Sequence, residues 1–208
     1  MVIIGGHLPA GSDFRFSPED GFDTPLGTIV ADQALRDAIV PKISAVADKG
    51  TDNTIEVHLP MAAHRFPGIP VACFRVPNDA SAAQLGSAIA AYSVFTGKKI
   101  FVIGSTDLTH YGSAYGFEPA GHGPEGFQWA RRVDKAIIEA FVALDEERAL
   151  KRAETDSSAC SVGAAIAAMA YARHMHALRP RLLMRGSSDE IAPGGDSSVG
   201  YCAVAFMH

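Results

Sequence analysis

The sequence has little cysteine, few aromatic residues and no excess of positive charge. Its 208 residues include 3 Cys, 8% aromatic residues, and 18 Lys and Arg against 23 Asp and Glu, which gives a net charge of -5. A negative net charge provides no basic footprint, so nucleic-acid binding is not expected. Cys73, Cys160 and Cys202 lie far apart, form no C-x-x-C pair and leave one thiol over, which favours reduced thiols over a disulfide framework.

The sequence also lacks a long uninterrupted apolar run. Segments 82–95 and 159–172 contain Gly, Gln or Ser and are shorter than the ~20 residues that a membrane span requires. The N-terminus has no basic region followed by an apolar stretch and a small-residue cleavage site. We therefore expect a cytoplasmic protein that does not contact membranes.

What the sequence does contain is an alternation of apolar strands and helical patterns. Strands are expected at 1–5, 70–76, 99–104, 181–184 and 199–207, and helices at 28–43, 54–66 (interrupted at Pro60), 79–95, 127–144, 146–153 and 161–178. Strands that alternate with helices predict βαβ units. We expect one domain, 1–208, an α/β sandwich whose largely parallel central sheet is flanked by helices. A strand at the first residue indicates either an edge strand or a missing N-terminal element.

Two expected strands end in side chains that are able to do chemistry. Segment 100–103 predicts a buried parallel strand and is followed by Asp107 and His110, while His7 follows the apolar segment 2–4 and two glycines. The carboxyl ends of parallel strands meet in one crevice, so these side chains are expected to converge. Asp107 and His110 could form an acid/base pair or bind a metal. The alternative is structural: Asp107 caps a turn and His110 binds a backbone carbonyl.

Cys160 and Glu56 complete the set of candidate site residues. Cys160 precedes an expected helix, whose dipole favours a thiolate, so it is a candidate nucleophile or soft metal ligand; a buried structural cysteine is the alternative. Glu56 could orient a metal ligand or lie exposed, and of Glu56 and His58, two residues apart, only one is expected to reach a site. No serine lies in a G-x-S-x-G turn. The set of two His, one Cys and one Asp therefore fits a mononuclear iron, copper or zinc site better than a hydrolytic triad.

Taken together, these motifs resemble the Memo family, known in prokaryotes as AmmeMemoRadiSam system protein B. Six segments carry the resemblance in order along nearly the whole chain: Ile3-Ile4-Gly5-Gly6-His7, Thr24-Pro25-Leu26-Gly27, Thr54-Ile55-Glu56-Val57-His58-Leu59-Pro60, Ser105-Thr106-Asp107-Leu108-Thr109-His110-Tyr111-Gly112, Cys160 with Gly163, and Ser197-Ser198-Val199-Gly200-Tyr201. The resemblance implies a fold like that of the class III extradiol ring-cleaving dioxygenases and a pocket with a non-haem metal. It implies that His7 and Cys160 are metal ligands. It also implies that Asp107 and His110 line the pocket, with His110 as acid/base on a bound phenol.

The chain departs from the family pattern at several positions. Family members usually carry an upstream H-A-G-Y-x-Y-S-G segment that contributes another metal-binding histidine, and we expect this segment to be missing. Asn53, Ser161 and Ala164 stand where the family usually has His, Gly and Pro. With His7 and Cys160 alone, metal affinity is expected to be poor unless Asp107, His110 or another chain supplies a further ligand.

Three functional readings remain open at this point. The first is a metal-dependent oxidoreductase of the extradiol dioxygenase type that acts on an unknown small molecule. The second is a non-enzymatic binding or scaffold protein with a vestigial pocket, working with radical-SAM or AMMECR1-like partners, as the family name suggests. The third is a hydrolase that uses Cys160 and His110. An oligomer is compatible with each of them.

Overall fold

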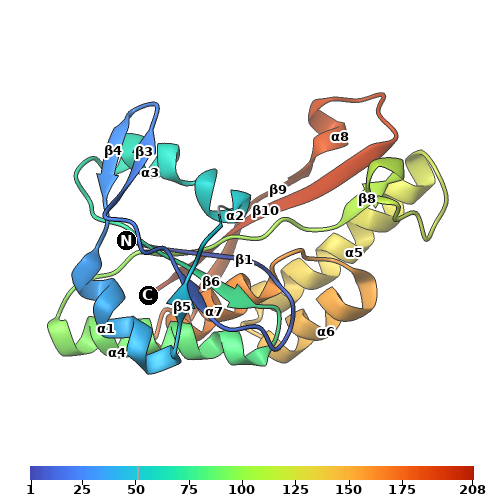
Figure 1. Ribbon diagram of the computed structural model, residues 1–208. Helices are drawn as coiled ribbons and strands as arrows, with labels where there is room; N and C mark the ends of the chain where they lie inside the picture. Colours follow the sequence, from blue (N-terminus) through green and yellow to red (C-terminus); the bar gives the residue numbers. More distant parts are fainter. Residues whose placement is uncertain (51) are drawn as a thin grey trace.

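The computed structural model describes residues 1–50 and 52–208 and shows a mixed α/β fold (Figure 1). The strands are β1 (Val2–Leu8), β2 (Arg15–Phe16), β3 (Gly21–Thr24), β4 (Gly27–Val30), β5 (Val46–Ala47), β6 (Ala72–Pro77), β7 (Val102–Gly104), β8 (His110–Gly112), β9 (Arg179–Ser187) and β10 (Ser197–Met207). The helices are α1 (Gln33–Ile43), α2 (Asn53–Glu56), α3 (Leu59–Arg65), α4 (Ala83–Thr96), α5 (Pro124–Val142), α6 (Glu146–Asp156), α7 (Val162–His174) and α8 (Ser188–Ile191), with 3-10 turns η1 (Ala80–Ala82) and η2 (Ser113–Tyr115).

Five of these strands form the central sheet, in the order β5-β2-β6-β1-β7. β1 is parallel to both β6 and β7, and β2 is parallel to β5 but antiparallel to β6. A second sheet, β8-β10-β9, is antiparallel, and β3 and β4 form a separate hairpin. The prediction of a mostly parallel central sheet flanked by helices is confirmed.

The two faces of the central sheet are buried by different helices, as the alternation of side chains along β1 illustrates. Val2 and Ile4 belong to the larger core cluster, which includes apolar residues of α1, α4 and α7. Ile3 points to the opposite face and packs with Ile55 of α2 and Leu59 of α3. In Figure 1 the sheet accordingly lies between α1 and α4 on one side and α2 and α3 on the other.

The structure corrects three expectations about the elements. β1 lies between β6 and β7, so it is a central strand and not an edge strand. Residues 28–30, expected to open a helix, belong to β4, and the helix starts only after Asp32, whose side chain accepts the Leu35 N–H. β7 is parallel as predicted but forms the edge of the sheet, and Phe101 before it is 57% exposed rather than buried.

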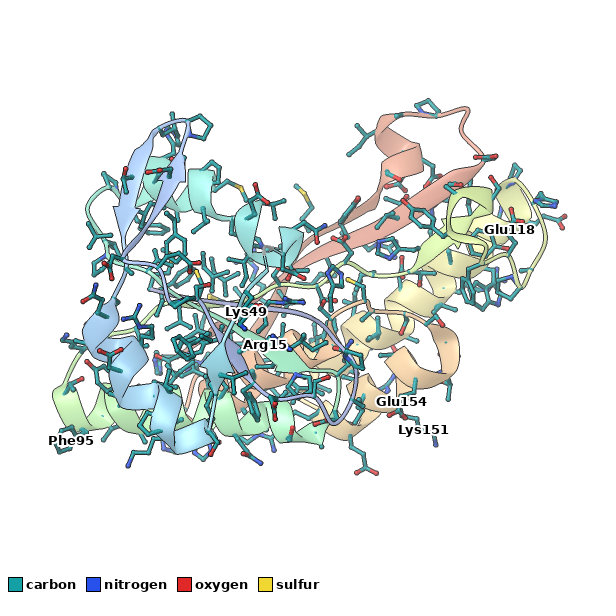
Figure 2. All side chains as sticks on the ribbon, viewed as in Figure 1. Arg15, Lys49, Phe95, Glu118, Lys151 and Glu154 are labelled. Carbon is teal, nitrogen blue, oxygen red and sulfur yellow. The ribbon has the colours of Figure 1, made fainter. Side chains whose placement is uncertain are left out.

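The outer surface of the helical layer carries both charged and apolar side chains. Figure 2 shows Lys151 and Glu154 projecting from α6 into solvent and Phe95 pointing outward at the end of α4. Throughout the described residues, no helix combines the length and apolar character needed to cross a membrane.

Candidate functional site

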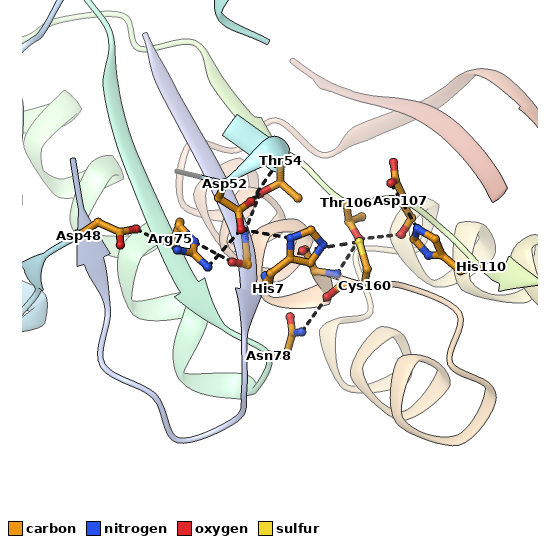
Figure 3. Close-up of polar contacts among 12 residues, drawn as sticks. His7, Asp48, Asp52, Thr54, Arg75, Asn78, Thr106, Asp107, His110 and Cys160 are labelled. Carbon is orange, nitrogen blue, oxygen red and sulfur yellow. Dashed lines mark hydrogen bonds and ion pairs between the residues drawn. The ribbon is translucent and has the colours of Figure 1, made fainter. Parts of the chain in front are cut away.

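His7 occupies a strained position near the end of β1. The pairing of β1 with β6 shifts register between Gly5 and Leu8, and His7 within this irregularity has φ 57°, in the left-handed region. Its backbone N–H donates to Ser161 Oγ at 3.1 Å, which ties the strand to the start of α7. Such irregularities turn a side chain away from the face of the sheet on which regular alternation would place it. The His7 ring is therefore directed along the edge of the sheet, toward Cys160 in Figure 3.

A carboxylate fixes the orientation of the His7 ring. His7 Nδ1 lies 3.1 Å from Asp52 Oδ2, so Nδ1 donates to the carboxylate and Nε2 is the ring nitrogen that points away from it. Asp52 also accepts hydrogen bonds from Thr54 and an ion pair from Arg75 at 3.1 Å. Burial alone would raise the pKa of Asp52, but the bonds from Thr54 and the charges of Arg75 and His7 outweigh it and lower that pKa. Asp52 is thus held as a carboxylate.

Cys160 lies two residues before α7, next to the N-cap Ser161, and is half-buried. Its Sγ lies 3.8 Å from Thr106 Oγ1 and 3.7 Å from Ser161 Oγ, and its N–H donates to the Asp107 carbonyl at 3.3 Å. The Asn78 side chain donates to the Cys160 carbonyl at 2.9 Å. These contacts fix the cysteine against the segment that follows β7.

Gly6 allows the His7 and Cys160 segments to meet. A Cβ added at Gly6 would lie 2.5 Å from Ser161 Cβ and 3.0 Å from Ser161 Cα. Only a residue without a side chain permits this approach between β1 and the start of α7.

Asp107 and His110 lie side by side, with 3.6 Å between Asp107 Oδ2 and His110 Nε2. The two side chains are 36% and 30% exposed, so both are reachable from solvent. In the part of the chain that the structure describes, the Asp107 carboxylate binds no backbone N–H and the His110 ring binds no carbonyl. Tyr115 packs edge-on against His110, with ring centroids 4.9 Å apart. Neither side chain therefore makes the contact with the backbone that the structural alternative requires.

The structure brings His58, rather than Glu56, to the interior. Glu56 is exposed and makes no side-chain hydrogen bond or ion pair within residues 1–50 and 52–208, and the carboxylate that orients His7 is Asp52. His58 Nε2 lies 2.9 Å from Ser105 Oγ. Burial lowers the pKa of His58, and the negative charge of Asp107 opposes that shift in part. The two-residue spacing indicated that one of the pair would point inward, but not which.

A large cavity adjoins these residues. Its volume is about 1120 Å³, and it runs between β7, α7 and β10. Polar side chains at one end include those of Thr54, His58, Thr106 and Asp107, whereas the remaining walls are mostly apolar. His7, Cys160 and His110 do not line this cavity, which adjoins them at Thr106 and Asp107.

The donors do not form a complete metal site by themselves. Over residues 1–50 and 52–208, no three His, Cys, Asp or Glu side chains come together in a group able to hold a metal ion. The structure places His7 and Cys160 on one side and the Asp107–His110 pair beyond them (Figure 3). A metal at this place would need at least one further ligand.

The other two cysteines lie outside the site. Burial raises the pKa of the Cys73 thiol in β6 to about 12 and that of the Cys202 thiol in β10 to about 11. Thiols with such raised pKa values are poor nucleophiles at neutral pH. Sequence reasoning did not single out Asp52 or Arg75 for this site, because their roles depend on contacts between distant segments.

Comparisons with known proteins agree with this picture. A family model described as Memo-like protein matches residues 1–205. A MEMO1 family protein of Pyrococcus abyssi is 32% identical over 219 residues, covering 98% of this chain and 75% of the relative. A MEMO1 family protein of Methanosarcina barkeri is 31% identical, covering 98% of this chain and 74% of the relative.

A solved structure shares the fold. It is an uncharacterized protein, JW3007, from Escherichia coli K12, with a TM-score of 0.55 and 14% sequence identity. The match covers 96% of this chain and 84% of that chain. At this identity the likeness concerns the fold alone.

Proposed function

Because the chain belongs to the Memo family, we propose that it binds a small organic molecule beside His7, Cys160, Asp107 and His110. The pocket would be related to that of the class III extradiol dioxygenases. The supporting observation is the convergence of side chains from separate segments at the carboxyl ends of β1 and β7 and the start of α7 (Figure 3). Asp52 holds the His7 ring in place through its Nδ1.

In this proposal the Asp107–His110 pair transfers a proton. His110 takes the proton of a phenol-like hydroxyl, and the carboxylate 3.6 Å away stabilises the imidazolium that forms. The cavity that Asp107 also lines offers apolar walls for the ring of the molecule. In this proposal the four side chains bind and orient the molecule, and His110 removes the proton of its hydroxyl group.

A non-haem metal, iron, copper or zinc, is a conditional part of the proposal. His7 and Cys160 supply an imidazole and a thiol, a pair that suits copper or zinc better than iron. Because the described residues contain no group of three donors, these residues alone do not fit a mononuclear site. A metal would require a donor from the bound molecule or a partner chain, and we assign no chemical step to it.

The absence of a three-donor group in the described chain also favours a second candidate function. The protein would be a cytoplasmic, non-enzymatic binding or scaffold protein that keeps the pocket and acts with radical-SAM or AMMECR1-like partners. This candidate shares the binding pocket with the first and differs only in catalysis.

A titration with 4-nitrocatechol, followed by its absorbance, tests the proposal. We expect saturable binding of one molecule per chain. His110→Gln should weaken this binding about tenfold, the loss expected for one charged hydrogen bond. His122→Gln is the matched control, because His122 is 82% exposed and, among the described residues, pairs only with Glu118; it should leave the affinity unchanged within twofold.

Oxygen consumption and metal content separate the candidates. Oxygen uptake with catechols after anaerobic addition of Fe(II) supports the enzyme, whereas binding without uptake supports the scaffold. Binding by protein that contains no metal removes the metal from the proposal. If 4-nitrocatechol does not bind saturably, the pocket proposal is contradicted in both forms.

A further inference from the structure

A serine and a histidine form a close pair at the polar end of the large cavity. Ser105 follows β7, and its Oγ lies 2.9 Å from Nε2 of His58, which precedes α3. Both residues line the 1120 Å³ cavity. A hydroxyl within hydrogen-bond reach of an imidazole nitrogen is the arrangement of a nucleophile and its general base.

The environment of His58 suits the role of base. Burial lowers the pKa of His58 below its ordinary value of 6.5, while the charge of Asp107 acts against that shift. The imidazole is therefore neutral at neutral pH, and its Nε2 can accept the proton of Ser105. His58 does not have to lose a proton before it can act as a base.

Two backbone N–H groups lie next to the serine in sequence. Across the residues that the structure describes, the N–H groups of Thr106 and Asp107 donate to no acceptor. Both residues line the same cavity as Ser105. Backbone N–H groups directly after a nucleophile are suited to bind the negative oxygen of a tetrahedral intermediate.

The rest of the cavity indicates the class of substrate. Its walls include Phe101 just before β7, Ile103 of β7, Met169 of α7, and Val204 and Phe206 of β10. These apolar side chains would shelter a hydrocarbon chain of several carbons. We propose that Ser105 and His58 form an acyl-transfer site that hydrolyses esters with apolar acyl chains.

The chemical step balances without a cofactor. Ser105 Oγ forms a bond to the acyl carbon as its proton passes to His58 Nε2, and the carbonyl electron pair moves onto the oxygen. The carbonyl re-forms as the bond to the alcohol oxygen breaks, and His58 returns the proton to that oxygen. Water then attacks the acyl-serine, its proton moving through His58 to Ser105 Oγ. The sum is ester plus water giving acid plus alcohol.

This activity shares the large cavity and Asp107 with the pocket proposed above, but it uses neither His7, Cys160 nor His110. The fold also supplies an internal control. Ser87 Oγ lies 3.0 Å from His174 Nε2 between α4 and α7, an exposed Ser–His pair that does not line the cavity. Ser105 and Ser87 thus each contact a histidine of their own, but only Ser105 lines the cavity.

Labelling of the native full chain with an alkyl fluorophosphonate in the presence of EDTA tests the proposal. We expect one covalent adduct, mapped by peptide mass spectrometry to Ser105. His58→Gln should slow labelling by a factor of about 100, the usual contribution of a general base, and Ser87→Ala should not change its rate. p-Nitrophenyl octanoate should be hydrolysed with a kcat/KM about tenfold or more above that of the acetate, because its longer chain buries more apolar surface.

The labelling experiment tests the proposal even if Ser105→Ala fails to fold, because the adduct is mapped in the wild-type protein. Absence of an adduct on folded protein, or an adduct at a different residue, would overturn the proposal. So would Ser105→Ala protein that folds and hydrolyses the octanoate at the wild-type rate. A Ser105 adduct in protein that does not bind 4-nitrocatechol would support this site while the proposed function fails.

Discussion

At the scale of single residues, His7 shows how a strained backbone and a glycine place a functional side chain. A histidine at φ 57° is held in a sparsely populated conformation, which costs on the order of 1 kcal/mol or more and persists only where neighbouring contacts impose it. Here the contacts are the bond to Ser161, the bond to Asp52 and the close approach at Gly6. Strain of this kind is concentrated at binding and catalytic sites.

Gly6→Ala tests the close approach. The new Cβ would lie 2.5 Å from Ser161 Cβ, so β1 and the start of α7 must separate, at a cost of about 1–3 kcal/mol of unfolding free energy. Urea denaturation measures this loss. Gly195→Ala is the control, because a Cβ there meets only the Ser197 carbonyl oxygen at 3.8 Å; an equal loss in both variants would contradict the packing argument.

Asp52→Asn tests the carboxylate behind His7. The pKa of Asp52 is depressed below its ordinary value of 3.8, so its contribution to stability is complete above that value and is lost as the pH falls through the folded-state pKa. Asp52 and Arg75 are 6% and 13% exposed, and removal of one partner of such a pair costs about 3 kcal/mol. The difference in unfolding free energy from wild type should therefore be large at pH 7 and shrink toward pH 2. A difference that is independent of pH would show that charge is not the cause.

At the scale of elements, α5 supports the chain that leads to the site. Asp134 of α5 is 7% exposed and accepts the Thr109 N–H at 3.0 Å, between Asp107 and His110. Burial raises the pKa of Asp134, although the bonds from Thr109 and the charges of Arg131 and His110 act in the opposite direction. Burial of the ionised Asp134 carboxylate therefore lowers the stability of the fold, while its hydrogen bond fixes the backbone between Asp107 and His110.

Asp134→Asn should reveal that cost. A raised folded-state pKa means that the stability contributed by the protonated group is present below 3.8 and is lost as the pH rises through the folded-state pKa. A neutral amide keeps an acceptor oxygen for Thr109, so the variant should be more stable than wild type at pH 7 and equal to it at pH 3, as measured by urea denaturation. Asp13→Asn, at an exposed position, is the control. A loss of stability at pH 7 would contradict the assignment.

The elements themselves were largely predictable because their signals are local. Gly97 ends α4 as expected, and the break expected at Pro60 falls just before α3, whose first turn contains that proline. The position of β7 at the sheet edge was not predictable, because it depends on pairing between strands that are distant in sequence. The assignment of 28–30 to β4 depends likewise on its pairing with β3.

At the scale of the whole molecule, the sequence predicted only part of the arrangement around His7, because it selected Glu56, which is exposed, and missed Asp52. Strand ends in a parallel sheet share one edge, so His7 and Asp107 were expected near each other. The roles of Asp52 and of the His58–Ser105 pair arise from contacts across 45 and 47 residues of sequence. No local pattern encodes contacts of that range, so they became visible only in the folded chain.

The most direct test of the central claim, that separate segments build one binding pocket, is a double-mutant cycle on 4-nitrocatechol affinity with His7→Ala and His110→Gln. If one molecule contacts both side chains, the two losses should be non-additive, with a coupling free energy of at least ~0.5 kcal/mol. Additive losses, within about 0.3 kcal/mol, would show that His7 and His110 do not act on the same bound molecule and would contradict the account.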